Sequence, residues 1–232
     1  LAPEFVPPAL TLAEMLSDSR QYGEAMNILT ELTERHPNLL TPRLLQLRIL
    51  LEVGEVETAQ NLAQALRQAA PAQPEVELLW AEVKIRRGEL KEATSVLEAL
   101  LGSPDAKTNE RVLRLLAQID MNSHPPQFDG AAARLEEALA IPGVAAAELL
   151  LELAQVWLNA GQVTKAGEAF GRMATSTGAD VNSLLNGAVT AQSYGLFEPA
   201  HGLAKAALDL VRGTPAEAQV AAFVEQLGGM AG

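Results

Sequence analysis

The feature that most constrains this chain is an internal repeat of about 34 residues. Six short segments align on a shared alanine that follows a turn in each unit. The aligned residues are Ala25, Ala59, Ala93, Ala131, Ala166 and Ala200, and they are separated by 34, 34, 38, 35 and 34 residues. Self-similarity at this period is the signature of a repeat array, in which supersecondary units stack on their neighbours. The repeat therefore predicts a solenoid.

Each unit is predicted to consist of two antiparallel helices. Aromatic residues make up only 4% of the 232 residues, and runs of β-branched residues with period-2 alternation are missing. Apolar residues instead recur at three- and four-residue spacing, as in Leu149, Leu153 and Val156. Turns at glycines such as Gly88 alternate with turns that contain proline, such as Pro71. The chain is therefore predicted to be all-α, with helices of roughly 12 to 15 residues.

The repeats predict a single domain from residue 9 to residue 227. Its units are expected at about 9–39, 40–73, 74–107, 108–145, 147–180 and 181–214, with a capping helix over 216–227. Residues 1–8 contain three prolines and are expected to form a flexible lead-in, and residues 228–232 a flexible tail. The fourth unit carries an insertion at residues 122–127, which we interpret either as a tolerated surface loop or as a partner contact.

The repeat resembles the tetratricopeptide repeat (TPR), which has small and apolar residues at fixed helix positions. The fifth unit carries most of the TPR pattern, with Leu150, Leu153, Ala154, Trp157, Gly161, Ala166 and Phe170. The third unit supplies Trp80, Ala81, Gly88, Ala93 and Leu97, and the sixth supplies Leu184, Ala188, Gly195, Ala200 and Ala207. The second unit departs from the pattern at Gln46 and Leu47, and the fourth lacks the turn glycine.

The resemblance implies a right-handed superhelix of antiparallel helix pairs, a type of α-solenoid, that binds a protein or peptide partner. It also implies a concave amphipathic groove lined by the first helix of each pair. Carried onto this sequence, the groove positions are Leu44, Arg48, Leu51, Leu78, Glu82, Ile85, Arg114, Gln118, Leu151, Gln155, Leu158, Asn159 and Leu185. In the alternative interpretation, the leucines are half buried between adjacent pairs and line no binding site.

Catalytic and metal chemistry has little basis in the sequence. There is no Cys, and the three histidines, His36, His124 and His201, are too widely spaced for a helical metal site. Acidic pairs such as Glu136 with Glu137 fall on charged helix faces, and no phosphate-binding glycine motif is present. We therefore predict a protein that is not an enzyme and that needs no catalytic residue, metal or cofactor.

Charge restricts the classes of partner. The chain has 17 basic and 29 acidic residues, and its formal net charge of −12 repels phosphate. Neither nucleic acid nor an anionic membrane is therefore an expected partner. No apolar run reaches the roughly 18 residues of a membrane span, so direct membrane insertion is not expected either.

The sequence favours an interaction scaffold that is soluble in a bacterial cytoplasm or periplasm. A composition rich in Ala and Leu and poor in Lys suggests the bacterial source. A secretion, pilus or polysaccharide-export assembly would suit such a scaffold. A second interpretation is a TPR region of a larger enzyme or regulator, which the missing initiator Met and the Pro-rich start would fit. A third is a helical-repeat RNA binder of the pentatricopeptide type, against which the acidity argues.

Overall fold

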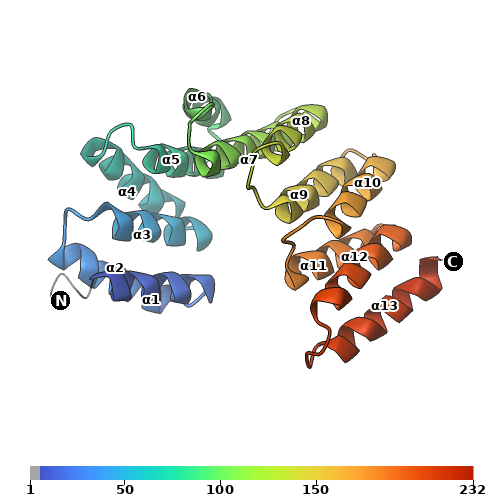
Figure 1. The fold of residues 1–232 in the computed structure, drawn as a ribbon. Coiled ribbons are helices and arrows are strands. Elements are labelled where there is room, and N and C mark those ends of the chain that lie inside the picture. Colours follow the sequence, from blue (N-terminus) through green and yellow to red (C-terminus); the bar gives the residue numbers. More distant parts are fainter. Residues whose placement is uncertain (1–5, 232) are drawn as a thin grey trace. The chain divides into compact units, whose positions relative to one another are not determined.

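The computed structural model describes residues 6–231 (Figure 1). This part of the chain contains thirteen helices and no strand. Twelve of them form the pairs α1 (Val6–Asp18) with α2 (Tyr22–Arg35), α3 (Leu40–Glu52) with α4 (Val56–Ala69), α5 (Pro74–Arg86) with α6 (Leu90–Leu100), α7 (Ala106–Asn122) with α8 (Phe128–Leu139), α9 (Ala146–Asn159) with α10 (Val163–Ala174), and α11 (Val181–Ser193) with α12 (Phe197–Leu210). The last helix is α13 (Glu217–Ala231).

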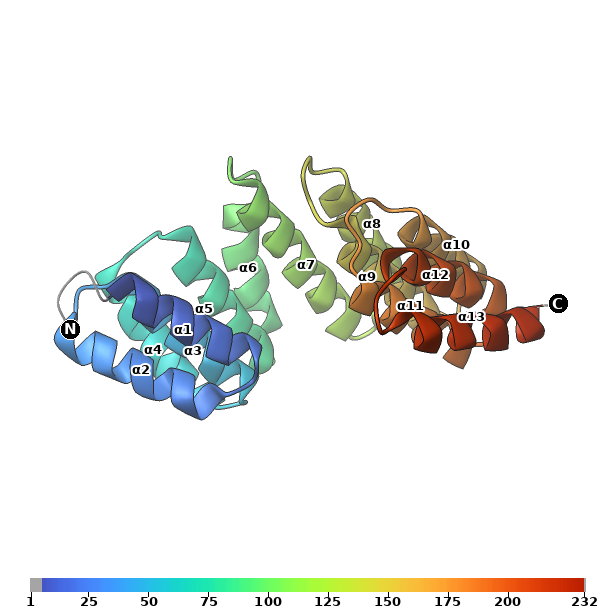
Figure 2. The ribbon, with the colours of Figure 1, turned by 60° about the horizontal axis from the view of Figure 1, so that its bottom comes forward.

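The helices fall into two compact units. The first unit extends to Gly102 and holds α1 to α6, and the second begins at Ser103 and holds α7 to α13. Within a unit, a second helix packs against its own first helix and against the first helix of the next pair, as α4 does with α3 and α5. Figure 2 shows the pairs of each unit following one another in this order. The predicted all-α solenoid is therefore confirmed within each unit.

Residues with positive φ end several of the first helices. Gly88, after α5, has a φ of 75°, and the next residue, Glu89, donates its backbone N–H to the carbonyl oxygen of Lys84 at 2.9 Å. Glycine adopts this conformation readily, and the resulting turn satisfies one of the last helical carbonyls. After α1, Arg20 takes the same conformation with a φ of 60°, and Gln21 donates to the carbonyl oxygen of Leu16 at 2.8 Å. The turn therefore also forms without glycine, although a side chain with Cβ is strained there.

The aligned alanines are all in the core. Each of the six, Ala25, Ala59, Ala93, Ala131, Ala166 and Ala200, has 0% exposed surface. In the first unit, Ala25 shares a cluster with Ala13 and Leu29 and with Ile49 of the next pair. In the second unit one continuous cluster runs from Leu113 to Leu227. Small side chains at these points let the helices approach closely, which explains why the alanine recurs with the period of the repeat.

Both ends of the described chain differ from the expected flexible segments. Helix α1 begins at Val6, so Pro7 and Pro8 lie in its first turn, where a proline removes no helical hydrogen bond. Residues 1–5 of the expected lead-in lie outside the described residues. At the other end α13 continues to Ala231, and its residue Leu227 is fully buried. Gly228 lies beside α12, since a Cβ at this position would be 3.4 Å from Nε2 of His201. Residues 228–231 of the expected tail are therefore helical.

The insertion in the fourth unit begins at the last residue of α7, which has 17 residues, and forms a tight turn before α8. The backbone carbonyl of Asp120 accepts hydrogen bonds from Oγ of Ser123 and from the N–H of Gln127, both at 2.8 Å. The carboxylate of Asp120 also pairs with Arg134 of α8 at 2.7 Å. Asp120 therefore fixes the point at which the chain leaves α7 and enters α8.

Candidate functional site

The predicted site residues of the second unit lie on three first helices. Four-residue spacing places each set on one side of its helix, with Arg114 and Gln118 on α7, Leu151, Gln155 and Asn159 on α9, and Leu185 on α11. One turn after Leu185, Val189 is 54% exposed. We call Gln118, Gln155, Asn159 and Val189 the second-unit face; none of these four side chains is charged.

Arg114 connects α7 to α9 through a cluster of carboxylates. Its guanidinium forms two hydrogen bonds with Glu152 of α9, one of them between Nε and Oε2 at 3.2 Å. Glu110 and Glu148 lie 3.4 and 3.6 Å away. Burial lowers the pKa of Arg114, but the hydrogen bond and the negative charge of Glu152 outweigh it, so the pKa is raised overall. The cation is therefore satisfied within the protein, and its role here is to hold two first helices at a fixed spacing.

The two amides on α9 form a pair with open hydrogen-bonding capacity. Nε2 of Gln155 donates to Oδ1 of Asn159 at 3.1 Å. This bond leaves the carbonyl oxygen of Gln155 as an acceptor and the amide nitrogen of Asn159 as a donor. A peptide unit has one donor and one acceptor on its main chain, so such a pair is chemically matched to an extended backbone. Val189 lies on α11, which contacts α9, and is an exposed apolar residue.

The structure places the predicted leucine rows deeper than the sequence suggested. Leu78 is 0% exposed, and Leu51, Leu158 and Ile85 are also buried. The half-buried members are Leu44, Leu151 and Leu185. Consecutive first helices contact each other, α3 with α5 and α9 with α11, so large apolar side chains between them are covered. The buried members pack beneath the surface residues, and their side chains are not accessible to a ligand.

The first unit has a charged counterpart of the second-unit face. Arg48 of α3 forms an ion pair with Glu75 of α5, again between consecutive first helices. Glu82, one turn after Leu78 on α5, is half buried. Arg48 and Glu82 thus give this row of positions charged side chains in the first unit, whereas Gln118 and Gln155 are neutral in the second.

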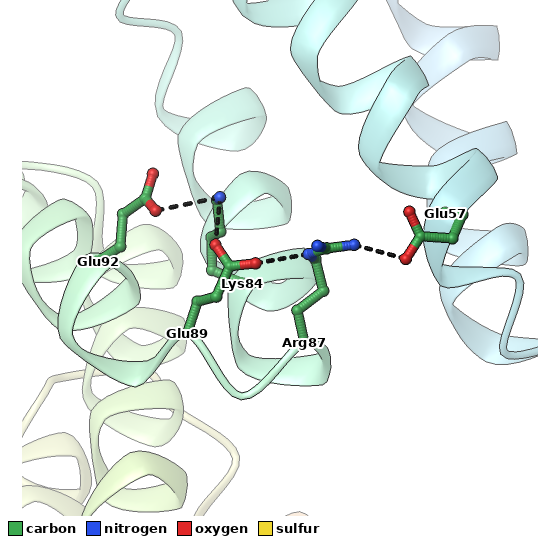
Figure 3. Close-up of polar contacts among 5 residues, drawn as sticks. All are labelled: Glu57, Lys84, Arg87, Glu89 and Glu92. Carbon is green, nitrogen blue, oxygen red and sulfur yellow. Dashed lines mark hydrogen bonds and ion pairs between the residues drawn. The ribbon is translucent and has the colours of Figure 1, made fainter.

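The sequence interpretation did not predict a charge network around the turn between α5 and α6. Figure 3 shows Arg87 between Glu57 of α4 and Glu89, with both contacts at 2.6 Å, and Lys84 between Glu89 and Glu92, at 2.6 and 3.1 Å. Hydrogen bonds from Lys84 and then Arg87 lower the pKa of Glu89 from 4.5 to about 2. One signal in the sequence could have indicated this network: a lysine stands at a core position of α5. In the structure this residue, Lys84, is only 7% exposed.

Lys84 also packs against an aromatic ring. Its ammonium nitrogen lies 4.5 Å from the ring centroid of Trp80, and the guanidinium carbon of Arg67 on α4 lies 4.9 Å from the same ring. Cations over a tryptophan ring are attracted by its quadrupole. These contacts hold α4, α5 and α6 together. We therefore interpret the network as structural.

The described residues offer no assembled site for metal chemistry. No group of three or more His, Cys, Asp or Glu side chains within residues 6–231 could hold a metal ion. The three histidines lie on separate elements, His36 after α2, His124 after α7 and His201 in α12. None of the helices in the described range is both long and apolar enough to cross a bilayer.

Comparison with known proteins supports the repeat assignment. Residues 50–119 match the family model of the tetratricopeptide repeat. No curated protein matches the sequence. A thermophilic TPR protein from Thermus thermophilus has a similar structure, with 18% identity, a TM-score of 0.65, and coverage of 79% of this chain and 97% of its own.

Two further similar structures each align over more than nine tenths of this chain. PilW, described as a widely conserved type IV pilus biogenesis factor, is 18% identical with a TM-score of 0.65, covering 94% of this chain and 99% of its own. PilF of Pseudomonas aeruginosa is 16% identical with a TM-score of 0.59, covering 93% and 96%. At these identities the likeness concerns the fold. Together with the match over residues 50–119 and the helix pairs of both units, it shows that the chain has the all-α fold of tetratricopeptide-repeat proteins.

Proposed function

We propose that this chain is a non-enzymatic scaffold that binds an extended segment of a partner protein on the second-unit face. The TPR fold is typical of protein–protein interaction modules. The observation that carries the proposal is the amide pair of Gln155 and Asn159, whose free acceptor and donor match a peptide backbone. Backbone hydrogen bonds give affinity, and side-chain pockets give specificity, when a protein binds an extended peptide.

The chemistry of the face defines the class of segment. Its polar groups are amides, and Val189 and the half-buried Leu151 and Leu185 add apolar area. An uncharged, moderately apolar segment is complementary to this surface. The net charge of −12 disfavours strongly acidic segments and nucleic acid.

We further propose that the scaffold works in a bacterial envelope assembly such as a pilus, secretion or polysaccharide-export apparatus. Support comes from the structural likeness to PilW, a type IV pilus biogenesis factor, which aligns over 94% of this chain. An Ala- and Leu-rich, Lys-poor composition agrees with a bacterial source.

Site-specific cross-linking tests the location of the partner. A photoreactive amino acid at Val189 should trap the partner in cells, whereas the same group at Leu210, which is equally exposed at the end of α12, should not. The trapped segment is then synthesised and titrated against the purified protein. Cross-links from Leu210 and none from Val189 would contradict the assigned face.

Substitutions on the face then test its chemistry. Gln155→Ala with Val189→Ser removes a hydrogen-bonding group and apolar contact, and should weaken binding by about tenfold to a hundredfold, since each lost contact contributes about 1 kcal/mol. Circular dichroism should remain unchanged, because both side chains reach solvent. Lys205→Ser, at an exposed position on α12, is the matched control.

A further inference from the structure

The amide pair of α9 has a counterpart on α7. A shift of 37 residues aligns the two helices and matches their buried residues one by one, with Val112, Leu113, Leu116, Ala117 and Ile119 of α7 at the positions of Leu149, Leu150, Leu153, Ala154 and Val156 of α9. The same shift places Gln118 at the position of Gln155, and Asn122 at the position of Asn159. Two consecutive first helices of the second unit therefore carry a glutamine and an asparagine four residues apart.

Both amide pairs can bind a peptide unit. Gln118 and Asn122 are exposed, so the α7 pair is open to solvent. Each of these amides has two N–H donors and a carbonyl acceptor. On α9, the bond from Gln155 to Asn159 leaves a donor and an acceptor free. Each pair can therefore donate one hydrogen bond to a peptide backbone and accept one from it.

The third helix of this row offers apolar area instead of amides. A shift of 34 residues aligns α9 with α11 and places Val189 and Ser193 at the positions of Gln155 and Asn159. Val189 is 54% exposed, and Oγ of Ser193 donates its hydrogen to the backbone carbonyl oxygen of Thr190 at 2.7 Å. The row therefore offers hydrogen bonds on α7 and α9, and an apolar contact on α11.

Contact between α7 and α9 sets the separation of the two amide pairs. Arg114 of α7 binds Glu152 of α9 directly, and both residues lie about one turn before the glutamine of their own helix. Neighbouring helices in proteins lie about 8–10 Å apart. A ligand that uses both pairs must therefore present equivalent backbone groups at about this interval.

The repeat of the polyproline II conformation matches this interval. It has three residues per turn and rises about 3.1 Å per residue, so equivalent backbone groups recur about every 9 Å. In a β-strand, residues on one side recur every second position, which is only about 6.5–7 Å. A polyproline II segment also has no internal hydrogen bonds, so its backbone groups are free to bind the amides.

We propose that the segment bound on the second-unit face is in the polyproline II conformation and crosses α7, α9 and α11 with one turn on each helix. This proposal rests on the function proposed above, and it adds Asn122 to the binding residues. A segment of this class is rich in proline and has no charged side chain, which agrees with the neutral amides of the row. A proline ring on the third turn would pack against Val189.

Two labelled peptides test the conformation. The probe is a capped peptide of about four Ala-Pro-Pro units, which keeps one N–H and three carbonyl groups in each turn. The control peptide has Gly-Ser in place of each Pro-Pro, so it is uncharged and flexible. In fluorescence anisotropy with the full chain, the proline peptide should bind at least about tenfold more tightly than the control peptide.

Substitutions test whether both helices take part. Asn122→Ala on α7 and Asn159→Ala on α9 should each weaken binding of the proline peptide by about threefold to tenfold, since each removes one hydrogen-bonding side chain. Both residues are exposed, so circular dichroism should not change. Lys205→Ser on α12 should leave the affinity unchanged. Equal affinities of Asn122→Ala and the parent chain would show that α7 takes no part and would overturn the proposal.

The results separate this proposal from the proposed function. Displacement of the partner segment trapped from Val189 by the proline peptide supports both. Equal binding of the two peptides, or binding of neither, overturns the polyproline II conformation. The proposed function still stands in that case if Gln155→Ala with Val189→Ser weakens binding of the trapped segment. Failure of that double change to weaken it contradicts the function and this proposal together.

Discussion

Gly88 separates the cost of a left-handed turn from the cost of packing, because a Cβ at this position would meet no atom within 4 Å. With φ at 75°, Gly88→Ala should lower the free energy of unfolding by about 1 kcal/mol, measured by urea denaturation. Gly171→Ala is the control: it is also open but lies within helix α10, and should raise stability by about 0.5–1 kcal/mol. Equal effects of the two changes would show that the turn conformation carries no strain.

Ala93 tests whether the repeated alanine marks a tight helix crossing. Its side chain is 0% exposed, so Ala93→Leu should overpack the site and lower the free energy of unfolding by about 1–3 kcal/mol. Ala99 lies on the same helix, α6, but is exposed, and Ala99→Leu should change stability by less than about 0.5 kcal/mol. The free energy of unfolding of both variants is measured by urea denaturation. Similar losses in the two variants would mean that the repeat register is wrong.

The period of 34 residues predicts burial at the alanines because small residues and turns are local signals. Burial of Leu78 was not predicted, because it depends on contact between α5 and the neighbouring first helix, which no local pattern records. Lys84 is a similar case: its burial becomes possible only when Glu89 and Glu92 neutralise its charge. Burial could not be predicted from the sequence for residues whose surroundings are supplied by another helix.

At the scale of an element, the turn from α5 to α6 is held by charges and should respond to pH. Folding lowers the pKa of Glu89 from 4.5 to about 2, so the folded state holds the carboxylate form and the unfolded state takes up the proton first. The stabilisation is fully present above about pH 5 and is lost as pH falls toward about 2.

Glu89→Gln should therefore lower the melting temperature at about pH 7 and lose less on acidification from about pH 5 to about pH 2.5 than the parent chain does. Thermal melts followed by circular dichroism at these pH values make the comparison. Glu98→Gln, at an exposed position of α6, corrects for removal of one negative charge. Parallel pH curves for Glu89→Gln and the parent would show that the Lys84 and Arg87 contacts do not stabilise the fold.

The spacing of turns predicts where the helices lie, but it does not predict the residues at which they begin and end. The prolines at positions 7 and 8 suggested a flexible start, yet a helix accepts proline in its first turn, and α1 begins at Val6. Glycines at 228 and 229 suggested a frayed end, yet packing of Leu227 keeps α13 helical. Weak local propensity is overridden wherever an apolar side chain finds a partner helix.

At the scale of the whole molecule, two tryptophans report on the two units separately. Trp80 lies in the first unit and Trp157 in the second, and the chain has no other tryptophan. If the repeats form one cooperative domain, as the sequence predicts, the urea midpoint from Trp80 fluorescence in Trp157→Phe should coincide with the midpoint from circular dichroism. Trp80→Phe, read through Trp157, should give the same agreement. Separate midpoints would show that the units unfold independently.

Metal removal should leave the protein unchanged. The described residues contain no cluster of three or more potential ligands, so metal binding has no free energy to add to folding. We expect an excess of chelator to leave the helical circular dichroism and the melting temperature as they were. A fall of several degrees, reversed by adding a divalent metal, would contradict this expectation.

The first and last helices of the described residues expose different kinds of side chain. Helix α13 uses Val220 and Leu227 to cover α12, and its outer side carries Gln219, Glu225 and Gln226, whereas α1 keeps Leu12 and Met15 uncovered. A helix added by design against α1 would therefore meet exposed apolar side chains, whereas one added against the outer side of α13 would meet mostly polar side chains. An engineered extension of the described residues is thus better built on α1 than on α13.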